Sequence, residues 1–290
     1  MVMGNDPFFQ DEIIFKADTH QYFNKQNEEY KSVSRALKGI QVPFDREGMS
    51  SRMAKKLAEE NGISESQAKK DLLEQWDNKK DNSIDKGNYV HDSLERYAIK
   101  GTYDDEMKEV TEFLLRILKE HYRYFPETII YSHKYKMAGR TDLSLVRQKS
   151  KNPVLDFLDY KSNAEKGIQF DSIGRKEIPI RHYNRFLLPP FDYLEDCNYT
   201  TYSLQLSIYA FMAMESLNVR IGRLGILFVD NDFKPSLIPV PFMYQEAKMI
   251  CEMNISQKQL PEIQEKLLPS STTPMPVFNS FSLTDIKEDW

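Results

Sequence analysis

Hydrophobic residues recur at helical spacing in the first part of the chain, after a stretch of short strands and turns. The first 45 residues contain these short elements, with EYKSVSRALKGI leading into a helix, and a helix is predicted from about Asp45 to Glu60. Ser64, followed three residues later by Gln67, has the form of a capping box, which marks the start of another helix. That helix carries apolar residues at four-residue spacing on one face: Ala68, Leu72 and Trp76.

Two further helices are predicted before the pattern changes. The first has Gly87 near its start and Gly101 as its stop, since glycine is a common residue at helix C-termini. One face of this helix places a histidine and a glutamate among apolar residues: His91, Leu94, Glu95 and Ala98. The second helix runs from about Asp105 to Tyr122 and is ended by Pro126.

From residue 127 onward the spacing becomes that of β-strands. The segment ETIIYSHKYKMAGRTDLSLV predicts two strands around a turn, and NPVLDFLDYKS predicts a third strand. The charged and aromatic loop from about Asn163 to Tyr199 is too long for a plain connection, which favours a functional or partner-dependent role. A helix from Thr200 to Ser216 and the strand RLGILFVD follow. The order helix, three strands, helix, strand predicts an α/β fold with an N-terminal helical region.

The composition is that of a globular protein. Of the 290 residues, 40% are hydrophobic and 29% charged, which provides ample material for a core. No apolar run reaches the roughly 18 residues of a membrane span, and the first residues lack the features of a signal peptide. The two cysteines, Cys197 and Cys251, are too few for a disulfide framework. These features predict a cytoplasmic protein without membrane association.

The charge of the chain is unevenly distributed. The net charge of −5 argues against a uniformly basic surface for nucleic acid. From His133 to Arg185, however, twelve Lys and Arg stand against six Asp and Glu, so this segment carries a surplus of six positive charges and the remainder carries −11. A basic stretch within an acidic protein fits a local groove for a polyanion, although solvated strand edges and loops would show the same pattern.

The most informative chemical pattern is Gly139-Arg-Thr-Asp142 followed by Asp159-Tyr-Lys161. Because side chains alternate along a strand, Asp159 and Lys161 project to one face of an otherwise apolar strand. Charge at such a position costs free energy unless it is paired or bound to metal. Asp142 on the neighbouring strand would complete a pair of carboxylates able to bind Mg²⁺ or Mn²⁺, while Gly139 leaves room for a close approach. The alternative is a buried Asp–Lys ion pair that joins two strands.

Three more polar residues lie on predicted helix faces. His91 sits beside apolar residues upstream of the carboxylates, where a core histidine is the alternative to a metal ligand. Gln205 and Tyr209 are four residues apart and share one face of the later helix. They could contact a phosphate or hold the lysine, or form a polar spot on an amphipathic helix.

Together these motifs resemble the RecB-like branch of the PD-(D/E)XK nuclease superfamily. The pattern in order is Gly87-x-x-x-His91-x-x-x-Glu95, Gly139-x-x-Asp142, Asp159-x-Lys161 and Gln205-x-x-x-Tyr209. The resemblance covers roughly Lys31 to Asp230, about two thirds of the chain. Thr141 stands where the superfamily name has proline. The stretches YKSVSRALKGIQVPFD and LLPPFDYL…YSLQLSIYAFM look like exonuclease-type members encoded by bacteriophages.

The resemblance implies a restriction-endonuclease-like core, with a central mixed sheet flanked by helices, and a role for each motif residue. His91, Asp142, Asp159 and the backbone carbonyl of Tyr160 would bind Mg²⁺ or Mn²⁺. Lys161 would act on the water and the transition state, with Gln205 and Tyr209 beside it as members of the catalytic set. Glu127 and Glu95 are further candidate metal ligands, and surface or salt-bridged residues are the alternative. Two cysteines cannot hold the iron–sulfur cluster of some relatives, so none is expected.

Basic residues on the strands and the long loop are candidates for nucleic-acid binding. The set consists of Arg140, Lys166, Arg175, Lys176, Arg181 and Arg185. In the loop, Tyr183 and Phe186 are interleaved with the arginines, so arginines could hold phosphates while aromatic rings stack on unpaired bases. A solvated loop is the alternative.

The expected function is metal-dependent hydrolysis of DNA phosphodiester bonds by an exonuclease of recombination, repair or phage replication. A non-cleaving nucleic-acid-binding scaffold and an RNA endonuclease of the same fold are the alternatives. We expect a single nuclease domain over residues 1–267, with an N-terminal helical part at 1–86 and a catalytic core at 87–230, and a mobile tail at 268–290. DNA is the expected partner, a replication or recombination protein could bind the tail, and an oligomer would explain processive digestion.

Overall fold

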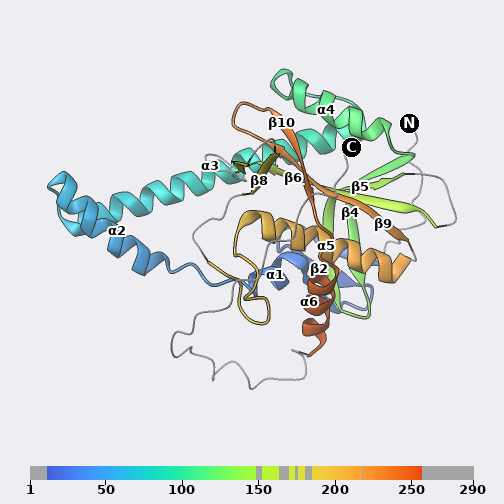
Figure 1. Cartoon of the computed structure of the whole chain (residues 1–290), viewed down its shortest axis with the longest axis horizontal. Helices are drawn as coiled ribbons and strands as arrows, with labels where there is room; N and C mark the ends of the chain where they lie inside the picture. The colour runs from blue at the N-terminus through green and yellow to red at the C-terminus, as the bar shows by residue number, and fades with distance from the viewer. Residues whose placement is uncertain are drawn as a thin grey trace.

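The computed structural model describes residues 12–147, 152–162, 170–173, 176–179, 185–217 and 219–256. An eight-stranded mixed sheet forms its centre (Figure 1). The strands along its main path are β1 (Ile13–Lys16), β2 (Gln21–Asn24), β3 (Glu29–Ser32), β5 (Met137–Val146), β6 (Val154–Ser162), β9 (Arg220–Val229) and β10 (Pro235–Val240), while β4 (Arg123–Ser132) pairs with β5. The pairs β3–β5 and β6–β9 are parallel and the others antiparallel.

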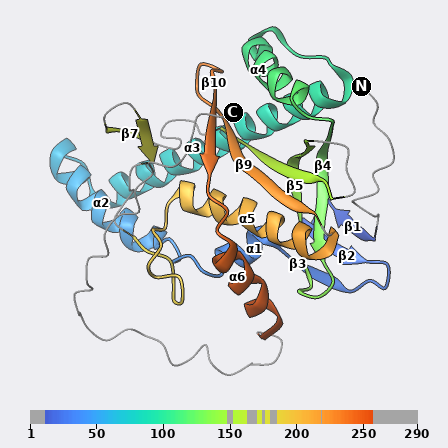
Figure 2. The same ribbon diagram turned by 45° about the vertical axis from the view of Figure 1, so that its right-hand side comes forward.

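Helices cover both faces of this sheet (Figure 2). The helices of the described residues are α1 (Val33–Lys38), α2 (Arg46–Asn61), α3 (Glu65–Lys100), α4 (Lys108–Lys119), α5 (Asn198–Leu217) and α6 (Tyr244–Ser256), with a 3₁₀ turn at Asp105–Met107. A separate hairpin joins β7 (Phe170–Ile173) to β8 (Lys176–Pro179). The α/β class with a central mixed sheet flanked by helices is confirmed.

Strand alternation divides the core into two layers. Phe157 and Ile226 belong to the cluster under α1, α5 and α6, whereas their neighbours Leu158 and Leu227 belong to the cluster under α3 and α4. Strands that are apolar on both faces follow from helices on both sides. Asp159 and Lys161, two and four residues after Phe157, therefore project toward α5.

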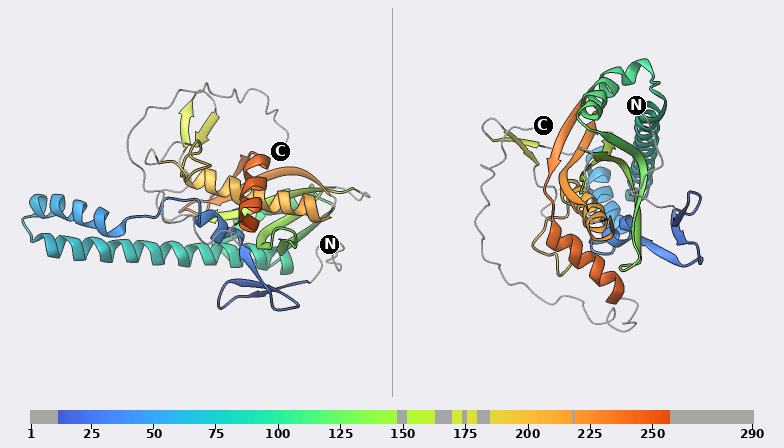
Figure 3. Two further views of the ribbon diagram at one scale, coloured as in Figure 1. Left: turned by 90° about the horizontal axis from the view of Figure 1, so that it is seen from below. Right: turned by 90° about the vertical axis from the view of Figure 1, so that its right-hand side faces the viewer.

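The helices α2 and α3 form an arm that projects from the body (Figure 3). The helix α3 has 36 residues, which corresponds to a length of about 54 Å. Small residues allow α2 to pack closely against it: Ala54, Ala58 and Ala68 are all buried. The Ser64 side chain accepts a hydrogen bond from the Gln67 N–H at the start of α3, as the capping pattern predicted.

Two predicted boundaries are wrong. Gly87 lies inside α3 rather than near the start of a separate helix, because Val90 and Leu94 continue the buried face and one internal glycine costs only about 1 kcal/mol. Pro126 does not end the preceding helix, which stops at Lys119, but lies within β4. Proline is tolerated there because β4 is an edge strand that pairs only with β5.

The sequence pattern also missed elements after residue 230. The strand β10 and the helix α6 were not predicted, and the expected long loop contains the β7–β8 hairpin. The expected tail at 268–290 lies outside the described residues. Among the residues that the structure describes, no helix is both long enough and apolar enough to span a membrane.

Candidate active site

The candidate site lies in a notch along one edge of β5. The strand β4 pairs along one edge of β5. The strands β3 and β6 both pair along the opposite edge, which is where the notch lies. The strand β3 pairs with Met137 and Ala138, and β6 pairs only from Leu143 onward. Residues 139–142 therefore face a gap between two strands, and the first positions beyond the β5–β6 ladder are Asp142 and Asp159. The pairing of β5 with β6 thus ends at the two carboxylates that the sequence predicted to be close together.

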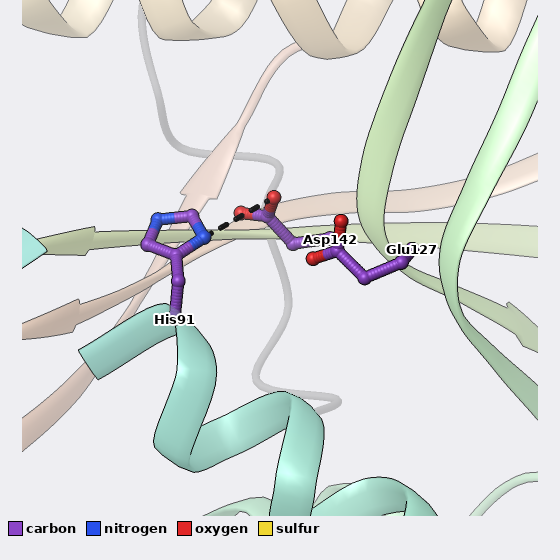
Figure 4. A group of neighbouring side chains, drawn as sticks. All are labelled: His91, Glu127 and Asp142. Carbon is purple, nitrogen blue, oxygen red and sulfur yellow. Dashed lines mark ion pairs between the residues drawn. The ribbon is translucent and has the colours of Figure 1, made fainter. Parts of the chain in front are cut away.

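A histidine and two carboxylates converge at this notch. One potential ligand atom each from His91, Glu127 and Asp142 lies within 4.8 Å of the others. Figure 4 shows His91 reaching from α3 toward Asp142, with Glu127 beside it. The distance from His91 Nδ1 to Asp142 Oδ1 is 3.5 Å, and the other Asp142 oxygen accepts a hydrogen bond of 2.5 Å from the Tyr160 N–H. The notch thus brings together three side chains from separate elements.

Glu127 stands directly across the β4–β5 ladder from Asp142. Pro126 pairs with Leu143 and Thr128 with Thr141, so the register places Glu127 opposite Asp142. The backbone of Glu127 has a φ of 52°, which is unusual for a residue other than glycine. Such strained residues occur preferentially at functional sites. Arg140 forms an ion pair with Glu127 at 2.6 Å and holds its carboxylate at the rim of the cluster.

Asp159 and Lys161 form an ion pair on the α5 side of the notch. The carboxylate of Asp159 also accepts a hydrogen bond of 3.3 Å from Gln205, and the Gln205 amide lies 3.4 Å from the Tyr209 hydroxyl. The ammonium of Lys161 lies 4.9 Å from the centre of the Tyr202 ring. The predicted DxK strand and QxxxY helix therefore meet through direct contacts. Asp159 is not among the three residues whose ligand atoms cluster most closely.

Gly139 permits the close approach of α5 to β5. A Cβ atom at this position would lie 2.5 Å from Tyr209 Cε1 and 3.0 Å from Val33 Cγ2. The Tyr209 side chain is buried and belongs to the core cluster, and its only open side is the cavity that it lines. The close approach expected at Gly139 is therefore present, and Tyr209 is the group that makes it.

Burial and like charge shift the acid–base properties of these groups. Burial raises the pKa of Glu127 to about 7, with a further upward contribution from Asp142. Burial also raises the pKa of Asp159 to about 6, although Lys161 opposes this. Burial would raise the pKa of Asp142, but the charges of His91 and Lys161 outweigh it and the pKa is lowered. Carboxylates crowded in this way gain stability from a bound cation.

These residues line one cavity of about 430 Å³. The sequence-predicted members of its lining are His91, Glu95, Glu127, Gly139, Arg140, Asp142, Asp159, Lys161, Gln205 and Tyr209. The ring of Tyr160 packs edge-on against that of His91, with centroids 5.7 Å apart. The chain therefore brings to one place the histidine helix, the GxxD strand, the DxK strand and the QxxxY helix, together with Glu127.

The predicted nucleic-acid-binding residues have different positions. Arg140 lines the cavity and is ion-paired with Glu127. Arg185 lies outside the cavity lining and forms an ion pair with Asp196. Lys166, Arg175 and Arg181 lie outside the described residues, as does the side chain of Lys176.

Sequence reasoning missed the part of the cavity formed by the β1–β2 hairpin, the end of β3 and the start of α1. His20, Tyr22, Ser32 and Ser34 also line it. No periodic or motif signal marks these residues, because their place in the site depends on the pairing of β3 with β5, more than 100 positions further along the chain.

The sequence matches no protein-family model, and it matches no curated protein. Among solved structures, similarity is found to a protein from Eubacterium rectale that is named "Putative exonuclease". The two chains are 13% identical, with a TM-score of 0.33, over 94% of this chain and 97% of the other. A similarity this low carries no argument about function.

Proposed function

We propose that this protein is a metal-dependent nuclease that hydrolyses DNA phosphodiester bonds, an exonuclease of the PD-(D/E)XK superfamily. The observation that carries the proposal is the notch in which His91, Glu127 and Asp142 converge beside the Asp159–Lys161 pair. A structural ion pair between strands would explain Asp159 and Lys161 alone. It would not explain a second group of two carboxylates and an imidazole in the same cavity.

The donor set fits a hard divalent cation. Carboxylate oxygens suit Mg²⁺ and Mn²⁺, and the clustered ligand atoms of His91, Glu127 and Asp142 lie within 4.8 Å of one another. Asp159, in the same cavity, has one carboxylate oxygen that is buried without a hydrogen bond and is paired only with the Lys161 ammonium. A bound ion would supply an activated water and would stabilise charge on the phosphate.

The chain's own groups have distinct roles in this reaction. His91, Glu127, Asp142 and Asp159 would hold the ion and would thereby fix the position of the phosphate. Asp159 and the Tyr202 ring hold the ammonium of Lys161, which orients the attacking water or neutralises charge that develops on the phosphate. The Gln205 amide donates a hydrogen bond to the Asp159 carboxylate and another to the Tyr209 hydroxyl, so these contacts orient the Asp159 side chain. The residues proposed to bind the ion and those proposed to act on the phosphate therefore line the same cavity.

The test is incubation of purified protein with end-labelled linear DNA, circular DNA and RNA in the presence of Mg²⁺ or Mn²⁺. Labels at the 5′ and 3′ ends report the polarity, and an exonuclease spares the circle. We expect Asp142→Asn and Lys161→Met each to lower the cleavage rate by about 100-fold or more. Lys134→Met is the matched control, because Lys134 is exposed and lies outside the cavity lining.

The outcomes separate the alternatives. Cleavage of RNA alone would indicate the RNA endonuclease, and metal-dependent binding without turnover would indicate the scaffold. Divalent-dependent digestion that persists undiminished in Asp142→Asn would refute the assignment of the site.

A further inference from the structure

The cavity has walls of unlike charge. The helix α3 contributes the carboxylates of Asp92 and Glu95 to the lining. The β1–β2 hairpin and β5 contribute His20, Tyr22 and Arg140, and the Arg140 side chain is 41% exposed. A polyanion bound at the metal-ligand cluster is repelled by the α3 wall and attracted by Arg140. A strand that leaves the scissile phosphate would therefore meet less repulsion in the direction of the hairpin.

The hairpin wall is an aromatic cluster with a cation attached. The Phe15 ring packs against His20 at 5.1 Å and against Tyr22 at 4.9 Å between centroids. The Arg140 guanidinium lies 4.8 Å from the centre of the same Phe15 ring. Because Arg140 is also paired with Glu127, this cluster adjoins the candidate metal ligands directly.

His20 presents its ring at the rim of this wall. The residue is exposed and has a φ of 55°, in the left-handed region that non-glycine residues seldom adopt and in which Asn, Asp and His are the most frequent of them. The Phe15 ring supports one edge of the imidazole, while the residue itself lines the cavity. Proteins that bind single strands combine positively charged side chains, which hold the backbone, with exposed rings on which unpaired bases stack.

We propose that the β1–β2 hairpin is a nucleoside subsite, in which His20 stacks on an unpaired base and Arg140 contacts the adjoining phosphate. This inference rests on the proposed nuclease function and names its substrate class, a strand with an unpaired terminal nucleotide. A base held in a duplex keeps both faces stacked on its neighbours, so the subsite favours single-stranded or frayed ends over blunt duplex.

The test measures the affinity of the inactive Asp159→Asn protein for labelled oligonucleotides by fluorescence anisotropy with Mg²⁺. The ligands are a 12-nucleotide single strand, the same strand with an abasic residue at its 5′ or its 3′ end, and a blunt duplex. His20→Asn removes the ring and keeps a residue that tolerates the left-handed backbone. Lys16→Ala is the control, since Lys16 lies over the Phe23 ring on the same hairpin and outside the cavity lining.

We expect His20→Asn to weaken binding of the intact single strand about tenfold and to leave one abasic strand unaffected, because the abasic end has no base to stack. Arg140→Gln should weaken intact and abasic strands alike, and Lys16→Ala should change neither. The subsite would be overturned if His20→Asn lowered the affinity for the intact strand and for both abasic strands equally, or did not lower it at all. A preference of the parent protein for blunt duplex would overturn it as well. If the unaltered protein cleaves DNA and His20→Asn binds normally, only the subsite fails. If it neither binds nor cleaves nucleic acid, both proposals fail.

Discussion

Gly139 lies where the Tyr209 ring comes closest to β5, and its replacement by alanine would test the packing on which the site depends. The added methyl group would lie 2.5 Å from Tyr209 Cε1, 3.0 Å from Val33 Cγ2 and 3.1 Å from the Tyr209 hydroxyl. Ordinary contacts are about 3.5 Å or longer, so the ring or the strand must shift by roughly 1 Å. Tyr209 is only 4% exposed, so its ring could move aside only toward the cavity that it lines.

The expected cost follows from two opposing effects. Overpacking in a well-packed core costs about 1–3 kcal/mol. Alanine also restricts the unfolded chain, which returns about 0.4–1 kcal/mol. At the middle of both ranges the net loss in the free energy of unfolding is about 1.3 kcal/mol. For a chain of 290 residues this corresponds to a fall in Tm of roughly 2 °C.

Urea unfolding followed by circular dichroism measures this loss, with Gly87→Ala as the matched control. No atom lies within 4 Å of a Cβ placed at Gly87, which is inside α3, so alanine there should stabilise by about 0.5–1 kcal/mol. The double variant Gly139→Ala with Tyr209→Leu should lose less than the sum of the two single variants, because the smaller side chain makes room for the methyl group. A Gly139→Ala protein as stable as the parent, or strictly additive losses, would contradict the geometry of the contact.

Two other expectations concern charged groups. Asp156 is buried and accepts hydrogen bonds from His121, from Arg147 and from the backbone and side chain of Arg223, so Asp156→Asn should cost about 3–5 kcal/mol near pH 7. Burial would raise the pKa of Asp156, but these partners lower it, so the stabilisation is present above the unfolded-state pKa of about 3.9 and is lost as pH falls through the lower folded-state value. Urea unfolding should show that the difference in the free energy of unfolding between the parent protein and Asp156→Asn is smaller below about pH 3.9 than at pH 7. A difference that is the same at both pH values would exclude this charge network as its source. Glu127→Gln should weaken Mn²⁺ binding at least tenfold in a calorimetric titration, and unchanged affinity would remove Glu127 from the ligand set.

Local chemistry made much of the site predictable. Strand alternation placed Asp159 and Lys161 on one face, and the structure shows them paired there. The four-residue spacing of Gln205 and Tyr209 put both side chains on one side of α5, where they contact each other. Each of these inferences concerns residues close together in the sequence, for which the geometry of one element fixes the relation.

The rest of the site depends on pairing between distant segments. Glu127 stands opposite Asp142 because of the β4–β5 register, which could be derived only after the turn between Ser132 and Met137 had been placed. The contribution of His20 depends on β3 joining β5, and no local pattern encodes that pairing. The strand β10 escaped prediction because Pro235 and Pro239 suggest a loop, whereas an edge strand accommodates them.

Because α3 is one continuous helix, it restricts the insertions and deletions that the arm can accept. His91 follows the start of the helix at Glu65 by 26 positions, so the far end of the arm lies about 39 Å from that imidazole along a single rod. Inserting one residue within this span would turn the outer part by about 100° relative to the body, and α2 would no longer meet the face that carries Ala68. The arm can therefore change length only in steps of whole helical turns, and insertions of three or four residues, matched in α2, are the ones that the molecule should tolerate.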